Sequence, residues 1–187
     1  MRAGGLAEVA NPSAIFLVRR PHGDVPGSAI AAALEGTRPL LVEIQALVTP
    51  AGYGVPRRMT AGVDHNRVAL IAAVLEKRVG LHLGSHDIYV NAVGGVKLDE
   101  PAVDLAVACA LASSFRDVPV DPDLALAGEI GLTGELRPVT GVDKRVREAL
   151  KLGFSRFLTS GQSGSPTGAE SGLVPADTLA EALELAL

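Results

Sequence analysis

The most informative hydrophobic pattern in the chain lies between Ile88 and Ser114. Apolar residues alternate with polar ones at its start, and a long run of small apolar residues follows after two glycines and an acidic turn. The first spacing is typical of a half-buried strand and the second run of a helix, so this region predicts a strand, a loop and a helix. Pro101 suits the first helical turn, and we expect the carboxylate of Asp99 or Glu100 to accept backbone N–H groups there.

Hydrophobic spacing predicts further strands and helices on both sides of this region. Two strand-like runs, 28–34 and 40–48, are joined by a link of hairpin length, and an edge strand is expected near 57–60 in the glycine- and proline-rich stretch that follows. The other expected elements are a helical turn over 11–18, a helix over 65–79 between a capping Asp64 and Gly80, strands over 124–128, 136–139 and 154–160, a glycine- and serine-rich loop over 161–172, and helices over 141–152 and 176–187.

This alternation of strands and helices predicts an α/β fold. The hairpins make the sheet mixed, and the helices should cover it. No internal repeat or clear linker divides the chain, so we expect a tail or linker stump at 1–5 and a single domain over 6–187.

Composition limits the classes of protein to which the chain can belong. Hydrophobic residues make up 48% of its 187 residues and charged residues 20%, which is typical of a globular protein. No apolar run is long enough to span a bilayer and no secretion signal is present, so we expect a cytoplasmic location and no membrane partner. The net charge of −4 argues weakly against coating by nucleic acid, and an aromatic content of 3% leaves little for base stacking.

Basic residues gather at two places that are candidates for contact with DNA phosphates. One pair lies in a loop whose glycines permit close approach to a nucleic-acid backbone, and the richest basic run lies in the helix predicted over 141–152. The ordinary interpretation of that run is the solvated side of an amphipathic helix, and the alternative is a surface for phosphate or for another subunit. The DNA-binding candidates are Arg57, Arg58, Lys144, Arg145, Arg147 and Lys151.

The sequence gives little support for a metal site or for a reactive thiol. His82 and His86 are four residues apart, but the segment is not helical in pattern and lacks the acidic residue of an HExxH arrangement, so we expect no metal site. Cys109 is the only cysteine and lies in the apolar run, where we expect a small buried side chain.

Asp104 is a polar exception near the start of the apolar run. We expect a structural role, in which the carboxylate either favours the N-terminus of the helix or pairs with a basic residue of the later helix, such as Lys144 or Arg145. A catalytic role is the weaker alternative, because the sequence offers it no second acid, metal or nucleophile.

Two segments resemble the catalytic segments of the Lon protease family. The run around Glu100-Pro101-Ala102 is similar to the nucleophile loop of the Lon proteolytic domain, and GEIGLTGELRPVTGVDKRVREALKLGF (128–154) is similar to the segment that supplies its lysine. By position, the serine corresponds to Ala102 and the lysine to Asp143. A Ser–Lys dyad needs a hydroxyl and a neutral amine, so the resemblance implies a vestigial protease site without catalytic residues.

Longer segments narrow this resemblance to one family. They are EGTRPLLVEIQALV (35–48), HNRVALIAAVLEKRVGLHL (65–83), YVNAVGGVKLDEPAVDLAVACALASS (89–114) and GELRPV (134–139). Together they resemble the C-terminal Lon-like domain of the RadA (Sms) family of bacterial DNA repair proteins. The resemblance implies a Lon proteolytic-type fold, related to the second domain of ribosomal protein S5.

The resemblance also implies a function. It implies a hexameric ring that supports an ATPase ring, in a protein that acts as a DNA motor in homologous recombination and branch migration. The implied partners are the chain itself, DNA, and recombinase or other repair proteins. ATP, magnesium and zinc are expected in a preceding part of a longer protein, because this chain has no GxxxxGK(S/T) phosphate loop and one cysteine cannot make a zinc site.

Two alternatives stay open at this point. One is a pure interaction module that recruits repair partners without touching DNA. The other is an active Ser–Lys peptidase that uses other residues, although the two serines lie at the far end of their predicted helix from one of the lysines. The groups considered for it are Ser113, Ser114, Lys97 and Lys144.

Overall fold

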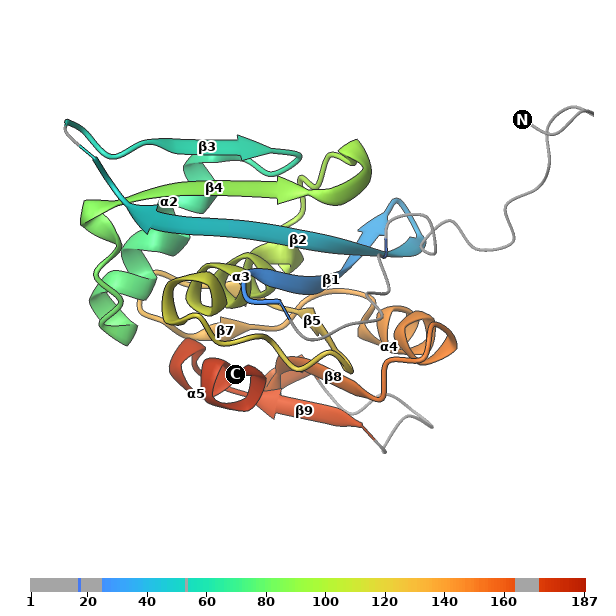
Figure 1. Ribbon diagram of the computed structural model, residues 1–187. Coiled ribbons are helices and arrows are strands. Elements are labelled where there is room, and N and C mark those ends of the chain that lie inside the picture. The colour runs from blue at the N-terminus through green and yellow to red at the C-terminus, as the bar shows by residue number, and fades with distance from the viewer. Residues whose placement is uncertain (1–16, 18–24, 53, 164–171) are drawn as a thin grey trace, which may run out of the picture.

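A seven-stranded mixed sheet forms the centre of the protein. The computed structural model describes residues 17, 25–52, 54–163 and 172–187. The strand order is β3-β4-β2-β1-β5-β8-β9 (Figure 1). The strands are β1 (Ser28–Glu35), β2 (Arg38–Pro50), β3 (Arg58–Ala61), β4 (His86–Ala92), β5 (Leu124–Ala127), β8 (Arg156–Ser160) and β9 (Leu173–Ala176). The predicted mixed α/β architecture is therefore confirmed.

The sheet has antiparallel strand pairs at its centre and parallel pairs toward both edges. β1 pairs with β2, and β2 with β4, in antiparallel register, so the predicted hairpin is confirmed. β5, β8 and β9 extend the sheet from β1 in parallel register. β3 lies at the opposite edge, parallel to β4, which confirms the predicted edge strand.

Helices cover the two faces of the sheet unequally. They are α2 (His65–Val74), α3 (Asp104–Arg116), α4 (Val142–Lys151) and α5 (Leu179–Ala186). α3 packs on β1 and β2 and is itself in contact with α2 and α5. Ten of its residues are buried, and a helix that is apolar all round suits such a central position.

α4 packs on the opposite face. Successive side chains of a strand point to opposite faces of a sheet, and along β2 Leu41 packs with α4, whereas Val42 and Ile44 belong to the core cluster that contains α3. The cluster under α4 draws on β1, β2, β5 and β8. The same face therefore remains without a covering helix over the middle of β2 and over β4 and β3, among the described residues.

The predicted helix over 65–79 is confirmed, with one difference in its last turn. Asp64 caps it, because its side chain accepts the backbone N–H of Arg67 at 2.8 Å. Residues Leu75–Val79 form a π-helical turn, which ends at Gly80 in the left-handed conformation with φ 78°. The N–H of Gly80 bonds to the carbonyl of Leu75, five residues earlier, which accounts for the wider turn.

Other elements differ in extent from the prediction. The strand predicted over 124–128 is β5, whereas the strand predicted over 136–139 is the shorter β7 (Leu136–Arg137), which forms a two-stranded ribbon with β6 (Glu129–Ile130). The last helix begins at Leu179, because the hydroxyl of Thr178 caps it by accepting the N–H of Glu181, and β9 precedes it. The turn predicted over 11–18, apart from Leu17, and most of the loop predicted over 161–172 lie outside the described residues.

Candidate nucleic-acid interface

Ala102, which the resemblance to Lon proteases matches with their serine, lies in a short 3₁₀ turn (Pro101–Val103) that leads from β4 into α3. Its side chain is buried, and its carbonyl accepts the N–H of Gly128 at 2.9 Å. Leu105, just inside α3, donates its N–H to the carbonyl of Gly128 at 3.1 Å. The loop is thus tied to the end of β5 by backbone bonds, with a methyl group where a nucleophile would be needed.

Asp143, the residue at the Lon lysine position, lies exposed in the first turn of α4. The helix begins after Gly141, whose φ of 68° is in the left-handed region that favours glycine. Lys144 is also exposed, and its Nζ lies 3.5 Å from the carbonyl oxygen of Thr37, which is the outer limit of a hydrogen bond.

The two serines that were considered as alternative nucleophiles make contacts with backbone groups. Ser113 Oγ accepts the N–H of Gly27 at 2.9 Å and donates to the carbonyl of Val118. Ser114 Oγ accepts the N–H of Val48 at 2.9 Å. Among the described residues, neither hydroxyl has a hydrogen bond to a lysine.

The buried Arg145 and the partly exposed Glu100 form an ion pair between α4 and the loop before α3. Nη1 and Nη2 of Arg145 donate to the two carboxylate oxygens of Glu100 at 2.8 and 2.7 Å. The guanidinium also donates to the carbonyls of Ala32 and Thr140, and Glu100 accepts the N–H of Leu34. The pair therefore links α4 with the loop before α3, and both of them with β1.

These contacts correct two predictions. Arg145 is not on the exposed side of its helix, because its side chain has 0% of its surface exposed, and a buried guanidinium needs this full set of acceptors. It is therefore removed from the DNA-binding candidates. Neither predicted capping carboxylate caps the helix that follows: Glu100 binds Leu34 and Arg145, and Asp99 pairs with Lys97.

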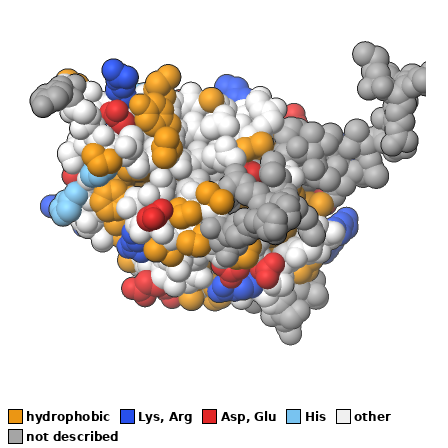
Figure 2. All heavy atoms as spheres, viewed as in Figure 1, with side chains coloured by type: hydrophobic (Ala, Val, Ile, Leu, Met, Phe, Trp, Pro, Cys, Tyr) orange, Lys and Arg blue, Asp and Glu red, His pale blue; other side chains and the backbone are white. Residues whose placement is uncertain are grey.

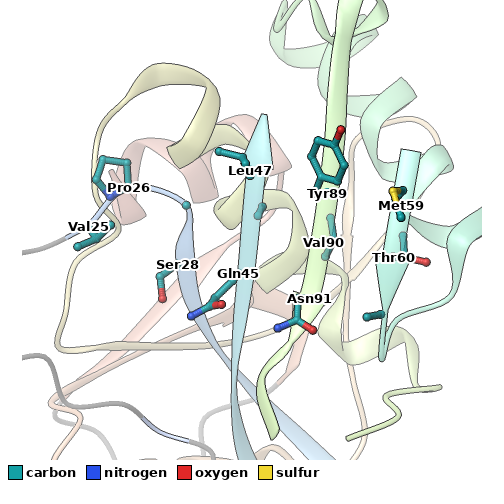
Figure 3. A pocket seen from close by; sticks show the side chains of 13 residues that line it. Val25, Pro26, Ser28, Gln45, Leu47, Met59, Thr60, Tyr89, Val90 and Asn91 are labelled. Carbon is teal, nitrogen blue, oxygen red and sulfur yellow. The ribbon is translucent and has the colours of Figure 1, made fainter. Parts of the chain in front are cut away.

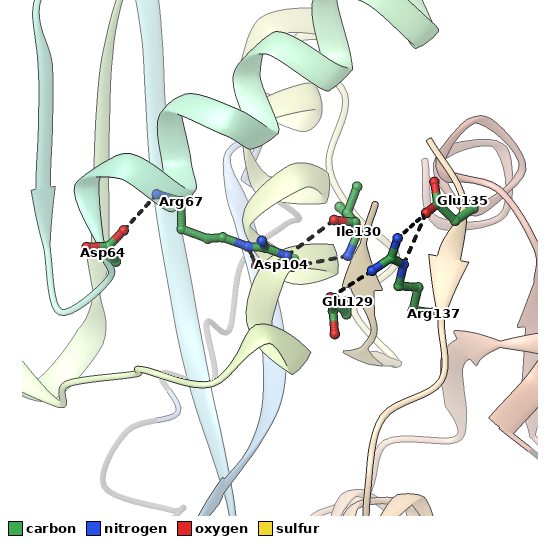
Figure 4. A network of polar contacts seen from close by, with 7 residues as sticks. All are labelled: Asp64, Arg67, Asp104, Glu129, Ile130, Glu135 and Arg137. Atoms are coloured by element: carbon green, nitrogen blue, oxygen red, sulfur yellow. Dashed lines mark hydrogen bonds and ion pairs between the residues drawn. The ribbon is translucent and has the colours of Figure 1, made fainter. Parts of the chain in front are cut away.

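Asp104 is structural, as predicted, but its partner is a different helix. Arg67 of α2 donates through Nε to Asp104 at 2.8 Å and through Nη2 to the other carboxylate oxygen, and the N–H of Ile130 donates to that oxygen at 3.1 Å (Figure 4). The predicted pairing with Lys144 or Arg145 is wrong, because α3 and α4 lie on opposite faces of the sheet. Burial raises the pKa of the Asp104 carboxyl, although Arg67 and the Ile130 N–H favour its charged form.

A second group of charges lies on the β6–β7 ribbon beside this pair. Arg137 is 2.8 Å from Glu135 and 3.7 Å from Glu129 (Figure 4). Hydrogen bonds from the hydroxyl of Thr133 and from Arg137 help to lower the pKa of Glu135 to about 2. The guanidinium of Arg137 thus already forms ion pairs with two carboxylates.

The remaining basic candidates are not engaged in this way. In the part of the chain that the structure describes, none of them forms an ion pair with an acidic side chain, and all but one are exposed, the exception being half-buried. They are Arg57 and the half-buried Arg58 at the start of β3, and Lys144, Arg147 and Lys151 on α4.

Four of these cations border the less covered face of the sheet, whereas Arg58 lies in register with Ile88 and is directed to the covered face. α4 packs on the less covered face, and its three cations point to solvent. Arg57 precedes β3 by one residue, so strand alternation directs it to the same face as Met59. Figure 2 shows a band of hydrophobic side chains over the β2–β4–β3 end of the molecule. Sequence reasoning missed this apolar band, because strand alternation does not say which face a helix will leave open.

The histidines and the cysteine that were considered in the sequence are not assigned a role in metal binding or thiol chemistry. Within residues 17, 25–52, 54–163 and 172–187, no group of three or more His, Cys, Asp or Glu side chains could hold a metal ion. The ring of His86 packs edge-on against Phe115 with centroids 5.1 Å apart. Cys109 is buried as predicted, and burial raises the pKa of its thiol to about 12. Over the same residues, no helix has the length and hydropathy needed to cross a membrane.

The ion pair at α4 should contribute strongly to stability. Replacing Arg145→Met takes the counter-charge from Glu100, which keeps the N–H of Leu34, and removes the donor of two backbone carbonyls, so we expect a loss of about 3 kcal/mol in the free energy of unfolding measured with urea. Lys144→Met, on the exposed side of the same turn, is the control and should change it by less than about 0.5 kcal/mol. Equal losses in the two variants would contradict this role.

The Arg67–Asp104 pair should give a pH-dependent loss. A carboxyl whose pKa is raised by folding stabilises the folded state at low pH, and this contribution is lost as the pH rises through the folded-state pKa. Arg67→Met removes the nearby cation and raises that pKa further. We therefore expect a loss of about 2 kcal/mol near neutral pH that shrinks as the pH falls toward the raised pKa of Asp104. A loss that does not vary with pH in urea unfolding would rule out a charged Asp104 as its cause.

Comparison with known proteins identifies the family. A protein-family model described as subunit ChlI of Mg-chelatase matches residues 58–163, which is more than half of the chain. The DNA repair protein RadA of Bacillus subtilis is 59% identical over 158 residues, which cover 84% of this chain and 34% of that protein. The proteins of the same name from Halalkalibacterium halodurans and Listeria monocytogenes are 52% identical over 189 residues and 53% identical over 191 residues, and each alignment covers 100% of this chain and 41% of the relative.

The chain thus spans between about a third and two-fifths of the length of these relatives. The resemblance of the longer segments to the RadA family is confirmed. The chain belongs to the family that this model describes, and it is a homologue of the bacterial DNA repair proteins named RadA.

Proposed function

We propose that this chain is the non-proteolytic, Lon-like domain of a RadA-type DNA repair protein and that it contributes to DNA binding. The observation that carries the proposal is a set of cations that form no ion pair with a described acidic side chain, four beside the less covered face of the sheet and Arg58 at its β3 edge, in a homologue of proteins named for DNA repair. Phosphate contacts by Lys and Arg supply most of the affinity of sequence-independent DNA binding. The candidates that remain are Arg57, Arg58, Lys144, Arg147 and Lys151.

In this proposal the domain is an architectural part of a larger machine. It forms a ring, of six copies by resemblance, which supports the ATPase ring of the longer protein in homologous recombination and branch migration. ATP, magnesium and zinc belong to that other part, and the protein works in the cytoplasm with recombinase or other repair proteins. The methyl of Ala102 and the carboxylate of Asp143 support the non-proteolytic role, because neither can do the chemistry of a Ser–Lys dyad.

A pure interaction module is the second candidate function. The exposed apolar side chains on the open face favour it, because contiguous exposed apolar patches often mark protein interfaces. The active peptidase gains no such support, since the hydroxyls of Ser113 and Ser114 are bonded to backbone groups.

DNA binding by the purified chain tests the proposal. We expect the logarithm of the affinity to fall linearly with the logarithm of the salt concentration. Arg57→Ala/Arg58→Ala should lower the magnitude of this slope by about one for each phosphate contact that is lost, and weaken binding about tenfold at moderate salt. The control is Lys77→Ala/Arg78→Ala, which removes two exposed cations from the π-helical turn on the other side of the sheet. If both double variants bind DNA alike, β3 does not carry the interaction.

Two further measurements separate the alternatives. Light scattering on the purified chain should give a mass several times 19.2 kDa, because ring formation needs no group that this chain lacks. A monomer at all concentrations would contradict a ring formed by this domain alone. Incubation with an unfolded protein substrate should give no cleavage, whereas cleavage that disappears in Lys144→Ala would overturn the non-proteolytic role.

A further inference from the structure

Two neighbouring cavities lie along α2, on the opposite side of the sheet from the groove over β2, β4 and β3 that Figure 3 shows. The first, of about 200 Å³, lies between α2, residues 98–101 and the start of α3. The second, of about 310 Å³, lies between α2 and the β6–β7 ribbon. Arg67 and Ile71 line both cavities. The two cavities therefore form one cleft, interrupted at these residues, which we call the α2 cleft.

The side chain of Arg67 bridges the α2 cleft (Figure 4). It donates through Nε and Nη2 to the two carboxylate oxygens of Asp104, and through Nη2 to the carbonyl of Ile130 at 3.2 Å. The ion pair is buried at one end only, because the Asp104 side chain is 0% exposed and the Arg67 side chain 33% exposed. The carboxylate is thus fixed inside the protein, whereas the long arginine side chain can turn to solvent through its rotamers.

The same ion pair closes the outer edge of β6. One edge of β6 pairs with β7, and no described strand covers the other edge. At that second edge, Ile130 donates its N–H to Asp104 at 3.1 Å and accepts from Arg67 through its carbonyl. A neighbouring strand offers the same acceptor and donor to a residue of an edge strand. The Arg67–Asp104 pair therefore takes the place of a strand at this edge.

Exposed apolar side chains border the α2 cleft on both sides. Leu70 of α2 is 44% exposed, and Leu132, in the turn between β6 and β7, is 65% exposed. An edge strand beside apolar pockets is the arrangement by which proteins bind extended peptides, since the main chain of the peptide adds a strand and its side chains fill the pockets. The cleft thus has the features of such a site, with Arg67 at the position of the added strand.

The charge of Asp104 determines what an added strand must carry. When Arg67 leaves, the described contacts of the Asp104 carboxylate are reduced to the N–H of Ile130. A buried carboxylate without a counter-charge is strongly unfavourable. A strand that replaces Arg67 must therefore bring a cation, and arginine can repeat the two hydrogen bonds that Arg67 makes.

We infer that the α2 cleft binds an extended, basic segment of a partner protein, which pairs with the edge of β6 and places an arginine on Asp104 in exchange for Arg67. Arg67 is then an internal competitor, and the apparent affinity for the segment depends on how often its side chain leaves Asp104. The inference goes beyond the DNA-binding function proposed above and does not depend on it. Neither Arg57 nor a cation of α4 lines the cleft.

A short synthetic peptide tests the exchange. The probe is fluorescently labelled Thr-Val-Arg-Val-Thr with blocked ends, and its partner control carries citrulline in place of arginine, which has nearly the same shape without the charge. Arg67→Ala removes the internal competitor, so we expect the purified variant to bind the arginine peptide about tenfold more tightly than the wild type does. The citrulline peptide should bind weakly to both proteins.

Two further variants separate the exchange from a general effect of charge or folding. Arg137→Ala removes a cation that also lines the second cavity but pairs with Glu129 and Glu135, so it should raise the affinity much less than Arg67→Ala. Arg67→Lys keeps a cation but not the forked donor, and should lie between the wild type and Arg67→Ala. It also serves as the test protein if Arg67→Ala does not fold, as judged from urea midpoints.

Hydrogen exchange at one amide locates the bound peptide. In Arg67→Ala, the arginine peptide should slow the exchange of the Ile130 N–H, because an added strand shields the edge of β6. Peptide binding that leaves this amide unaffected would place the peptide elsewhere and would overturn the inference.

Three other results would also overturn it. They are equal affinities of the folded wild type and the folded Arg67 variants for the arginine peptide, equal binding of the arginine and citrulline peptides, and a changed particle mass of Arg67→Ala without peptide binding, which would make the cleft an interface between copies of this chain. The DNA affinity of Arg67→Ala should equal that of the wild type. The peptide experiment gives its result whether or not the chain binds DNA, so the two proposals can fail separately.

Discussion

The ion pair between Arg145 and Glu100 joins three parts of the protein that are distant in sequence. It connects α4 with the loop before α3, and through Leu34 and Ala32 it also connects both with the end of β1. Removing Glu100 would leave the buried guanidinium of Arg145 without its counter-charge, so the position of α4 on the sheet depends on this pair. The loop that it holds contains the 3₁₀ turn Pro101–Val103 that leads into α3.

The position of α4 determines which surface remains for binding. α4 covers the face of β1, β5, β8 and the start of β2, and it presents three cations to solvent. The rest of that face carries the exposed side chains of Leu47 and Met59 with Tyr89 between them. In our account, one face of the sheet combines cations with exposed apolar side chains, whereas the other face is filled by α2, α3 and α5. This division is what links the fold to the DNA-binding function that we propose.

Much of the fold could be predicted from local patterns in the sequence. The hairpin, the helix capped by Asp64 and the strand–loop–helix from Ile88 to Ser114 depend on spacing and capping residues that lie close together in the chain. The partners of charged residues could not be predicted in this way. An amphipathic pattern placed Arg145 on the polar side of its helix, but the pattern carries no information on an acceptor 45 residues away. For the same reason Asp104 was assigned to α4, when its partner is Arg67 of α2.

The exposed apolar side chains over β2, β4 and β3 were not predicted, because we expected helices to cover the sheet and the alternation of a strand does not say which face a helix will leave open. Met59 offers a direct test of the surface, because it is one of two methionines in the chain and is 60% exposed. Peroxide converts exposed methionine to its sulfoxide, and mass spectrometry can follow the rate at this residue. Our account predicts that saturating DNA slows the oxidation of Met59 markedly. An unchanged oxidation rate with the DNA fully bound would show that DNA binds elsewhere and would contradict the account.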